Sequence, residues 1–138
     1  MTDNVERPLR PRPSINRDNQ FWFDGAAESR LLIQRCVGCG ALRHPPGPVC
    51  PSCHSFEWDS IEASGRGTIY SYVVNYHPQL PAFDYPLPIA LIELEEGTRL
   101  LSNLVGFEIE AIEVGQAVEV EFIEYDDELT LPAFHPAG

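Results

Sequence analysis

Apolar side chains in the second half of the chain follow strand-like patterns. The segment 67–76 is rich in β-branched and aromatic residues, and Val118, Val120 and Phe122 alternate in part with glutamates. Two apolar runs, 87–95 and 98–104, meet around Glu95-Glu96-Gly97, which is typical of a hairpin. We therefore predict five strands, at 67–76, 87–95, 98–104, 118–124 and 129–134, with a short helical turn within 107–114.

These strands predict the architecture of the second half. Five short antiparallel strands with an insertion between the third and fourth favour a small OB-type barrel, and a sandwich fragment is the alternative. Gly65 and Gly67 indicate a bend or bulge where the first strand begins. The overall expectation is a mainly β fold.

The first half has a different pattern. Residues 1–15 combine three prolines with three arginines, so we predict an arm that is either disordered or ordered by a partner. Residues 16–29 are predicted as a short helix with Asn16 as N-cap. Short strands are expected at 31–35 and 41–44.

All four cysteines form two C-x-x-C pairs, separated by ten residues. Two such pairs at this spacing predict a tetrahedral four-thiolate zinc site, built as a rubredoxin-like zinc ribbon. Iron is the main rival metal, and without a metal the cysteines would form two disulfides or remain free thiols. His44 and His54 are interpreted as surface or neighbouring residues rather than ligands. The predicted ligands are Cys36, Cys39, Cys50 and Cys53.

The expected organisation therefore has three parts. Residues 1–15 are a flexible Pro/Arg arm, 16–60 hold the N-terminal helix and the zinc ribbon, and 61–138 form the OB-fold domain. The ribbon is too small to fold by apolar burial alone, so its zinc is expected to be structural.

Charge narrows the classes of partner. The formal net charge is −12, and all nine basic residues are arginine. Because nucleic-acid affinity depends on cationic contacts to phosphates, we expect no nucleic-acid partner. A zinc-ribbon and OB-fold nucleic-acid-binding module remains the alternative, since Tyr70, Tyr72 and Tyr76 could stack on bases. An electron carrier with iron in place of zinc is a third hypothesis.

No apolar run is long enough to cross a bilayer, so no membrane partner is expected. The polar N-terminus and reduced cysteines favour a cytoplasmic protein. Motifs of hydrolases, metalloproteases and phosphate-binding loops are absent from the sequence, so no catalytic residue is predicted.

Two groups of large apolar residues are candidates for a partner interface. Three consecutive aromatic residues cannot share one helical face, and the Pro-rich loop 77–86 carries further large side chains. Ordinary packing against the ribbon is the alternative for the aromatic triplet. The candidates are Phe21, Trp22, Phe23, Leu80, Phe83 and Tyr85.

The order of several motifs resembles that of a known family. These are Phe21-Trp22, the cysteine quartet with Pro45-Pro46 inside it, Ser64-Gly65-Arg66-Gly67, the segment 88–99 and the segment 115–120. Over about residues 20–125 the chain resembles the zinc-ribbon/OB-fold acyl-CoA-associated proteins, also called domain of unknown function 35.

The resemblance implies a function. Similar proteins assemble with thiolase-like enzymes that make or break carbon–carbon bonds in acyl-CoA thioesters, including an aldolase that shortens a steroid side chain. By this resemblance we expect a non-catalytic subunit, in a hetero-oligomer of two copies of each chain, that partly lines its partner's active site. A CoA thioester shared with the partner would contact Arg66 and Arg99 through its phosphates.

Overall fold

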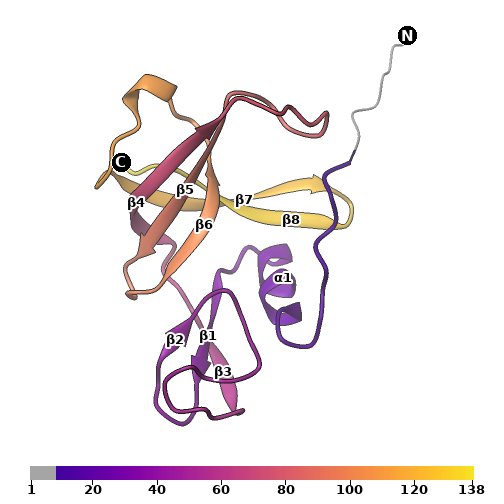
Figure 1. Cartoon of the computed structure of the whole chain (residues 1–138), viewed down its shortest axis with the longest axis vertical. Helices are drawn as coiled ribbons and strands as arrows, with labels where there is room; N and C mark the ends of the chain where they lie inside the picture. The colour runs from indigo at the N-terminus through magenta and orange to yellow at the C-terminus, as the bar shows by residue number, and fades with distance from the viewer. Residues whose placement is uncertain (1–8) are drawn as a thin grey trace.

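The computed structural model describes residues 9–138, which form a zinc-ribbon-like sheet, one α-helix and a closed β-barrel (Figure 1). The ribbon lies at one end of the molecule and the barrel at the other. No helix within residues 9–138 is long and apolar enough to span a membrane.

The ribbon sheet has three strands in the order β2-β1-β3. They are β1 (Leu32–Cys36), β2 (Leu42–Arg43) and β3 (Trp58–Glu62), and both pairings are antiparallel. The sequence predicted only the first two of these strands. We missed β3 because no face of this strand is fully buried, so its sequence has no clear apolar side that would mark a strand. It nevertheless pairs with the whole of β1, from Leu32–Glu62 to Cys36–Trp58.

The barrel confirms the five-strand prediction. Its strands, in the closed order β4-β5-β6-β8-β7, are β4 (Arg66–Asn75), β5 (Leu87–Leu94), β6 (Arg99–Leu104), β7 (Ala117–Asp126) and β8 (Leu129–Pro136). One expectation was wrong: β6 and β8 pair in parallel, through Asn103–Ala133 and Leu104–Phe134. This short parallel contact closes the barrel and leaves no free edge there. The predicted helical turn is the 3₁₀ segment η1 (Ile109–Ala111).

Two glycines allow the chain to enter the barrel. Gly65 has a φ of +86°, in the left-handed region that favours glycine. At Gly67 a Cβ atom would lie 2.5 Å from the carbonyl oxygen of Glu93 on the neighbouring strand. The close approach of β4 to β5 therefore depends on the absence of a side chain at Gly67.

One apolar core extends through the ribbon and the barrel. Leu31, Ile33 and Ala63 lie in the same buried cluster as Ile69, Ile92 and Phe134 of the barrel. The ribbon therefore rests on the barrel through apolar contact.

The helix is shorter than predicted. Helix α1 (Gln20–Ala27) begins after Asn19, which makes no side-chain cap hydrogen bond. The side chain of Asn16 accepts hydrogen bonds from the backbone N–H groups of Asp18 and Asn19, at 2.9 and 3.0 Å, as an N-cap residue does. Asn16 therefore caps the turn that leads into the helix, although the helix itself begins only at Gln20. The helix packs on β8 and β1.

The predicted arm falls partly outside the described residues, which begin at Leu9. Residues 9–15 run along the side of the barrel and past the end of the β7–β8 hairpin before the chain turns into α1 (Figure 1).

Candidate metal centre and docking surface

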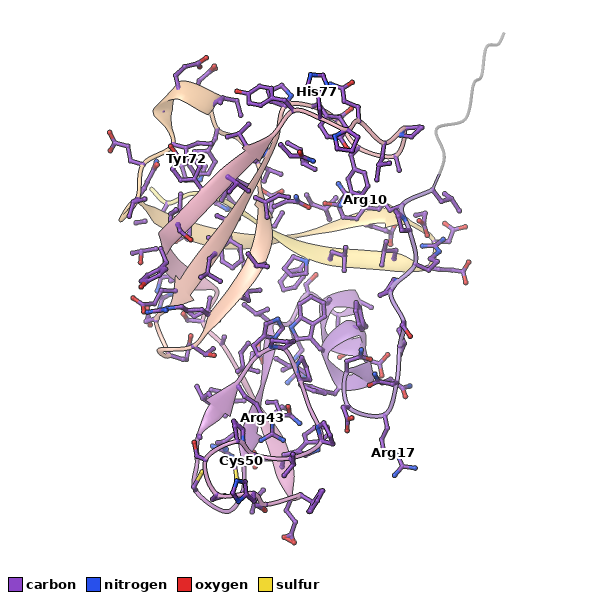
Figure 2. All side chains as sticks on the ribbon, in the orientation of Figure 1. Arg10, Arg17, Arg43, Cys50, Tyr72 and His77 are labelled. Carbon is purple, nitrogen blue, oxygen red and sulfur yellow. The ribbon has the colours of Figure 1, made fainter. Side chains whose placement is uncertain are left out.

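The four cysteines converge at the end of the ribbon farthest from the barrel, where Cys50 is labelled in Figure 2. Their sulfur atoms all lie within 4.8 Å of one another. The Sγ atoms of Cys36 and Cys53 are 3.5 Å apart, and those of Cys39 and Cys50 are 3.7 Å apart. Four sulfurs held at 2.3 Å from one zinc ion in a tetrahedron lie about 3.8 Å apart. The donor set and its geometry therefore fit a four-thiolate zinc ion.

Backbone donors around the cluster favour thiolates. The N–H of Cys39 lies 3.4 Å from the Cys36 sulfur, and this contact lowers the pKa of the Cys36 thiol. The N–H groups of Cys53 and Ser52 lower the pKa of Cys50 to about 6. Four neighbouring thiolates repel one another, so the dication is needed to keep all four deprotonated. A zinc ion bound here would be enclosed by four protein ligands and would have a structural role.

The two nearby histidines have different environments. His54 is exposed, as predicted, whereas His44 is half-buried with its ring centroid 5.7 Å from that of Trp22. Burial lowers the pKa of His44 to about 4. Its Nδ1 atom is buried without a hydrogen-bond partner among the described residues. Neither histidine belongs to the metal cluster.

The aromatic triplet on α1 packs on β3 and on the apolar core. The Phe21 ring lies 5.1 Å from Trp58 on β3, and the Trp22 ring packs edge-on against Phe23 at 4.9 Å. Trp22 also contacts the apolar core. All three side chains are half-buried in this chain. Their use in a partner interface stays a prediction, since much of each ring already packs internally.

The loop between β4 and β5 holds the other predicted interface residues. Leu80 is 51% exposed, whereas Phe83 and Tyr85 are half-buried. The Leu80 N–H donates a hydrogen bond of 2.9 Å to the Tyr85 hydroxyl. Of these three residues, Leu80 therefore presents the most surface to a partner.

Each of the two arginines predicted to bind CoA phosphates has an acidic partner. Arg66 donates hydrogen bonds of 2.8 and 3.1 Å to the two carboxylate oxygens of Glu95, and Arg66 lowers the pKa of Glu95. Arg99 lies 3.2 Å from Glu93 and stacks over the Tyr70 ring at 3.7 Å. Both side chains are on the barrel surface. A phosphate would have to displace these carboxylates, so the assignment stays a prediction.

Sequence reasoning missed the contacts of Arg10 and Arg12. These arginines pair with residues of the barrel that lie 93 and 114 positions away. Their abundance in the arm was visible in the sequence, but no local pattern identifies a partner at that separation.

Comparison with known proteins follows the same two-part division. Residues 23–59 match the family model described as the rubredoxin-like zinc ribbon domain of ChsH2, and residues 60–122 match that of the ChsH2 C-terminal OB-fold domain. The ribbon match supports zinc as the metal that the cysteine cluster holds.

Three curated relatives cover different shares of the chain. A probable enoyl-CoA hydratase alpha subunit of Thermomonospora curvata is 57% identical over 99% of this chain and 43% of its own length. A 3-oxo-4,17-pregnadiene-20-carboxyl-CoA hydratase alpha subunit of Mycobacterium tuberculosis is 38% identical over 91% of this chain and 40% of its own length. The benzoylsuccinyl-CoA thiolase subunit BbsA of Thauera aromatica is 35% identical over 69% of this chain and 67% of its own length. The chain thus spans about two fifths of the length of the first two.

A solved structure also matches this chain. One chain of an Ltp2-ChsH2(DUF35) aldolase is 57% identical, with a TM-score of 0.88, and the match covers 92% of this chain and 100% of that chain. The fold and site define a zinc ribbon joined to an OB barrel. The chain belongs to the DUF35 family, and its two domains are of the ChsH2 type.

Proposed function

We propose that this chain is the non-catalytic partner subunit of a thiolase-like acyl-CoA aldolase. The observation that carries the proposal is the match to the whole length of the DUF35 chain of an Ltp2-ChsH2 aldolase, at 57% identity. A relative that is a thiolase subunit supports the same class of partner. In this role the chain stabilises the partner and lines part of its active site.

The substrate class follows from a second relative. The Mycobacterium tuberculosis relative acts on a steroid side-chain CoA ester by name. We therefore propose that the complex performs retro-aldol cleavage of a steroid side-chain CoA thioester that carries a 17-hydroxyl group. The C–C bond between the hydroxyl-bearing carbon and the carbon α to the thioester breaks, the hydroxyl loses its proton and becomes the ketone of a 17-keto steroid, and the α-carbon takes up a proton to leave as propionyl-CoA. The reacting groups belong to the partner in this proposal.

The fold is consistent with a subunit that stabilises another protein. The zinc ion would be bound by four cysteine ligands, which leaves no open coordination position for a substrate. The core shared by ribbon and barrel makes them a stiff unit that can brace another protein. A cytoplasmic location belongs to the proposal, because zinc binding requires reduced thiols.

A shared CoA thioester is a further part of the proposal. Arg66 and Arg99 supply guanidinium groups on the barrel surface, and each would exchange its glutamate for a CoA phosphate. Arg66→Ala and Arg99→Ala should therefore weaken CoA binding to the complex. Arg35→Ala is the matched control, since Arg35 is a similarly exposed arginine paired with Asp59 on the ribbon.

Co-expression with a thiolase-like steroid aldolase tests the proposed function. We expect the two chains to co-elute on gel filtration, with a mass by light scattering that equals two copies of each. Separate elution at micromolar concentration would contradict the proposal.

A further inference from the structure

Arg10 connects three segments that are far apart in the sequence. Its guanidinium carbon lies 3.7 Å from the ring centroid of Tyr125 on β7 and 4.5 Å from that of Phe83 in the β4–β5 loop. Its Nη1 atom donates a hydrogen bond of 3.3 Å to the side-chain oxygen of Asn103 on β6. Figure 2 shows Arg10 directed toward the barrel, on the side where the loop bearing His77 lies.

A second arginine fixes the arm beside this contact. Arg12 donates two hydrogen bonds of 2.9 Å to the carboxylate oxygens of Asp126, at the end of β7. Bidentate pairs of this kind constrain geometry as well as adding attraction. With Arg12 held at β7, the backbone at Arg10 stays within reach of Phe83.

The β4–β5 loop, residues 76–86, has little regular structure of its own. It contains three prolines, and two hydrogen bonds within it join the Leu80 N–H to the Tyr85 hydroxyl and the Phe83 N–H to the Leu80 carbonyl. A loop with few backbone hydrogen bonds opens easily unless side chains hold it. The stacking of Arg10 on Phe83 is a contact of that kind.

Large apolar side chains are exposed in the same region, together with the polar residues His77 and Gln79. Val73, Tyr76 and Leu80 are 63%, 52% and 51% exposed, and they follow one another along the end of β4 and the start of the loop. Large apolar side chains exposed on a braced loop are suited to act as anchors in a protein interface.

We propose that Arg10 is a positioning residue that holds the β4–β5 loop in the conformation in which Val73, Tyr76 and Leu80 dock on the thiolase-like partner. This inference rests on the proposed function and assigns it a surface. A loop that is ordered before binding loses less entropy in the complex, which strengthens association. Because this chain carries a net charge of −12, the face it meets should be apolar at its centre and basic at its rim.

Hydrogen exchange of the isolated chain tests the brace without the partner. In Arg10→Ala we expect amides of residues 76–86 to exchange about fivefold to tenfold faster than in the wild type, from the loss of a cation–π contact. Arg10→Lys keeps the charge but loses the planar stacking, so its loop should exchange at a rate between those of the wild type and Arg10→Ala. Arg17→Ala is the matched control, because Arg17 is exposed and points away from the barrel in Figure 2.

Unchanged exchange of the loop in Arg10→Ala would overturn the brace. Phe83→Leu provides an independent test, since it removes the aromatic face and keeps an apolar side chain. It should accelerate exchange of the loop as Arg10→Ala does, and a loop as protected as in the wild type would also overturn the brace.

Affinity for the partner tests the docking surface. We expect Arg10→Ala and Leu80→Ser to raise the Kd for the thiolase-like subunit about tenfold, while Arg17→Ala leaves it unchanged. An Arg10→Ala variant with a loosened loop and unchanged Kd would overturn the docking role. Failure of the wild-type chain to bind would contradict the proposed function itself, whereas the exchange experiment would still report on the brace.

Discussion

Gln34 and Gly47 are joined by two hydrogen bonds, each 2.9 Å long. The Gln34 side-chain amide donates to the Gly47 carbonyl, and the Gly47 N–H donates to the Gln34 side-chain oxygen. Gln34 is completely buried in β1, and Gly47 lies in the Pro-rich loop between the two cysteine pairs. The pair therefore fixes the loop that carries the chain from one half of the metal site to the other.

Removing this amide should loosen the ribbon. Gln34→Met has a similar volume but leaves the Gly47 N–H without its partner, while the Gly47 carbonyl keeps a hydrogen bond of 2.9 Å from Arg43. We therefore expect a loss of about 1–3 kcal/mol in unfolding free energy. Urea denaturation of the zinc-loaded chain measures it. Gln20→Met is the control, at an exposed position on α1. Equal stability of the two variants would show that the Gln34 bonds add nothing.

His44 should make stability depend on pH. Its pKa falls from an ordinary 6.5 to about 4 through burial, so the folded state holds it neutral while the unfolded chain takes up a proton below pH 6.5. The contribution of neutral His44 to stability is therefore complete above pH 6.5. Below that pH the free energy of unfolding falls by about 1.4 kcal/mol per pH unit as the pH drops toward 4.

The His44 effect is measured as a difference between proteins. His44→Phe removes the titrating group and keeps an aromatic ring against Trp22. Urea denaturation at pH 7.5, 6.5 and 5.5 should show a flatter profile for His44→Phe than for wild type, and the comparison cancels the pH dependence that zinc binding adds to both. His77→Gln, in the exposed loop, should follow the wild type. Parallel profiles for His44→Phe and the wild type would refute this assignment.

The cysteine cluster should determine whether the ribbon folds. Cys50→Ser removes one of four ligands, so we expect zinc to be lost and the ribbon to unfold around it. Elemental analysis reports the metal, and tryptophan emission reports the fold, because Trp58 on β3 pairs directly with Cys36. Ser52→Ala, between two ligands but with no ligand atom, should retain zinc. An apoprotein with the emission and exchange protection of the holoprotein would contradict a structural metal.

Gly67 should tolerate no side chain. A Cβ atom there would lie 2.5 Å from the Glu93 carbonyl oxygen, and the Glu93 backbone cannot move away unless the whole strand shifts. We expect Gly67→Ala to cost about 1–3 kcal/mol, as overpacking in a tight structure does. Gly40 and Gly97 have open space around them but positive φ values, so Gly47→Ala, with neither restraint, is the better control. Thermal unfolding of both variants gives the comparison.

The sequence was most informative where chemistry or periodicity is local. The C-x-x-C pairs identified all four members of the cluster. The content of β-branched and aromatic residues, apolar runs and partial alternation placed all five barrel strands. The turn at Glu95-Glu96-Gly97 joins β5 and β6 as predicted. Each of these signals is contained within a short segment of neighbouring residues, so a single sequence is enough to reveal it.

Features that depend on distant partners were missed. Strand β3 has no distinctive pattern of its own and exists because β1 offers it an edge along its whole length. The parallel contact of β6 with β8 is a consequence of barrel closure. Gln34 appeared as an ordinary polar residue in a strand, because only the folded loop brings Gly47 to it. The fit of Arg10 between Phe83 and Tyr125 is equally invisible before folding.

We propose that this chain acts by supporting the active site of another protein. The most direct test of this proposal is the rate of C–C cleavage of a steroid side-chain CoA thioester, followed by release of propionyl-CoA. The rate should be compared for this chain alone, the thiolase-like partner alone and the two together. We predict turnover by the pair and none by this chain in isolation. Turnover of the thioester by this chain alone, or an equal rate for the partner with and without it, would contradict the account.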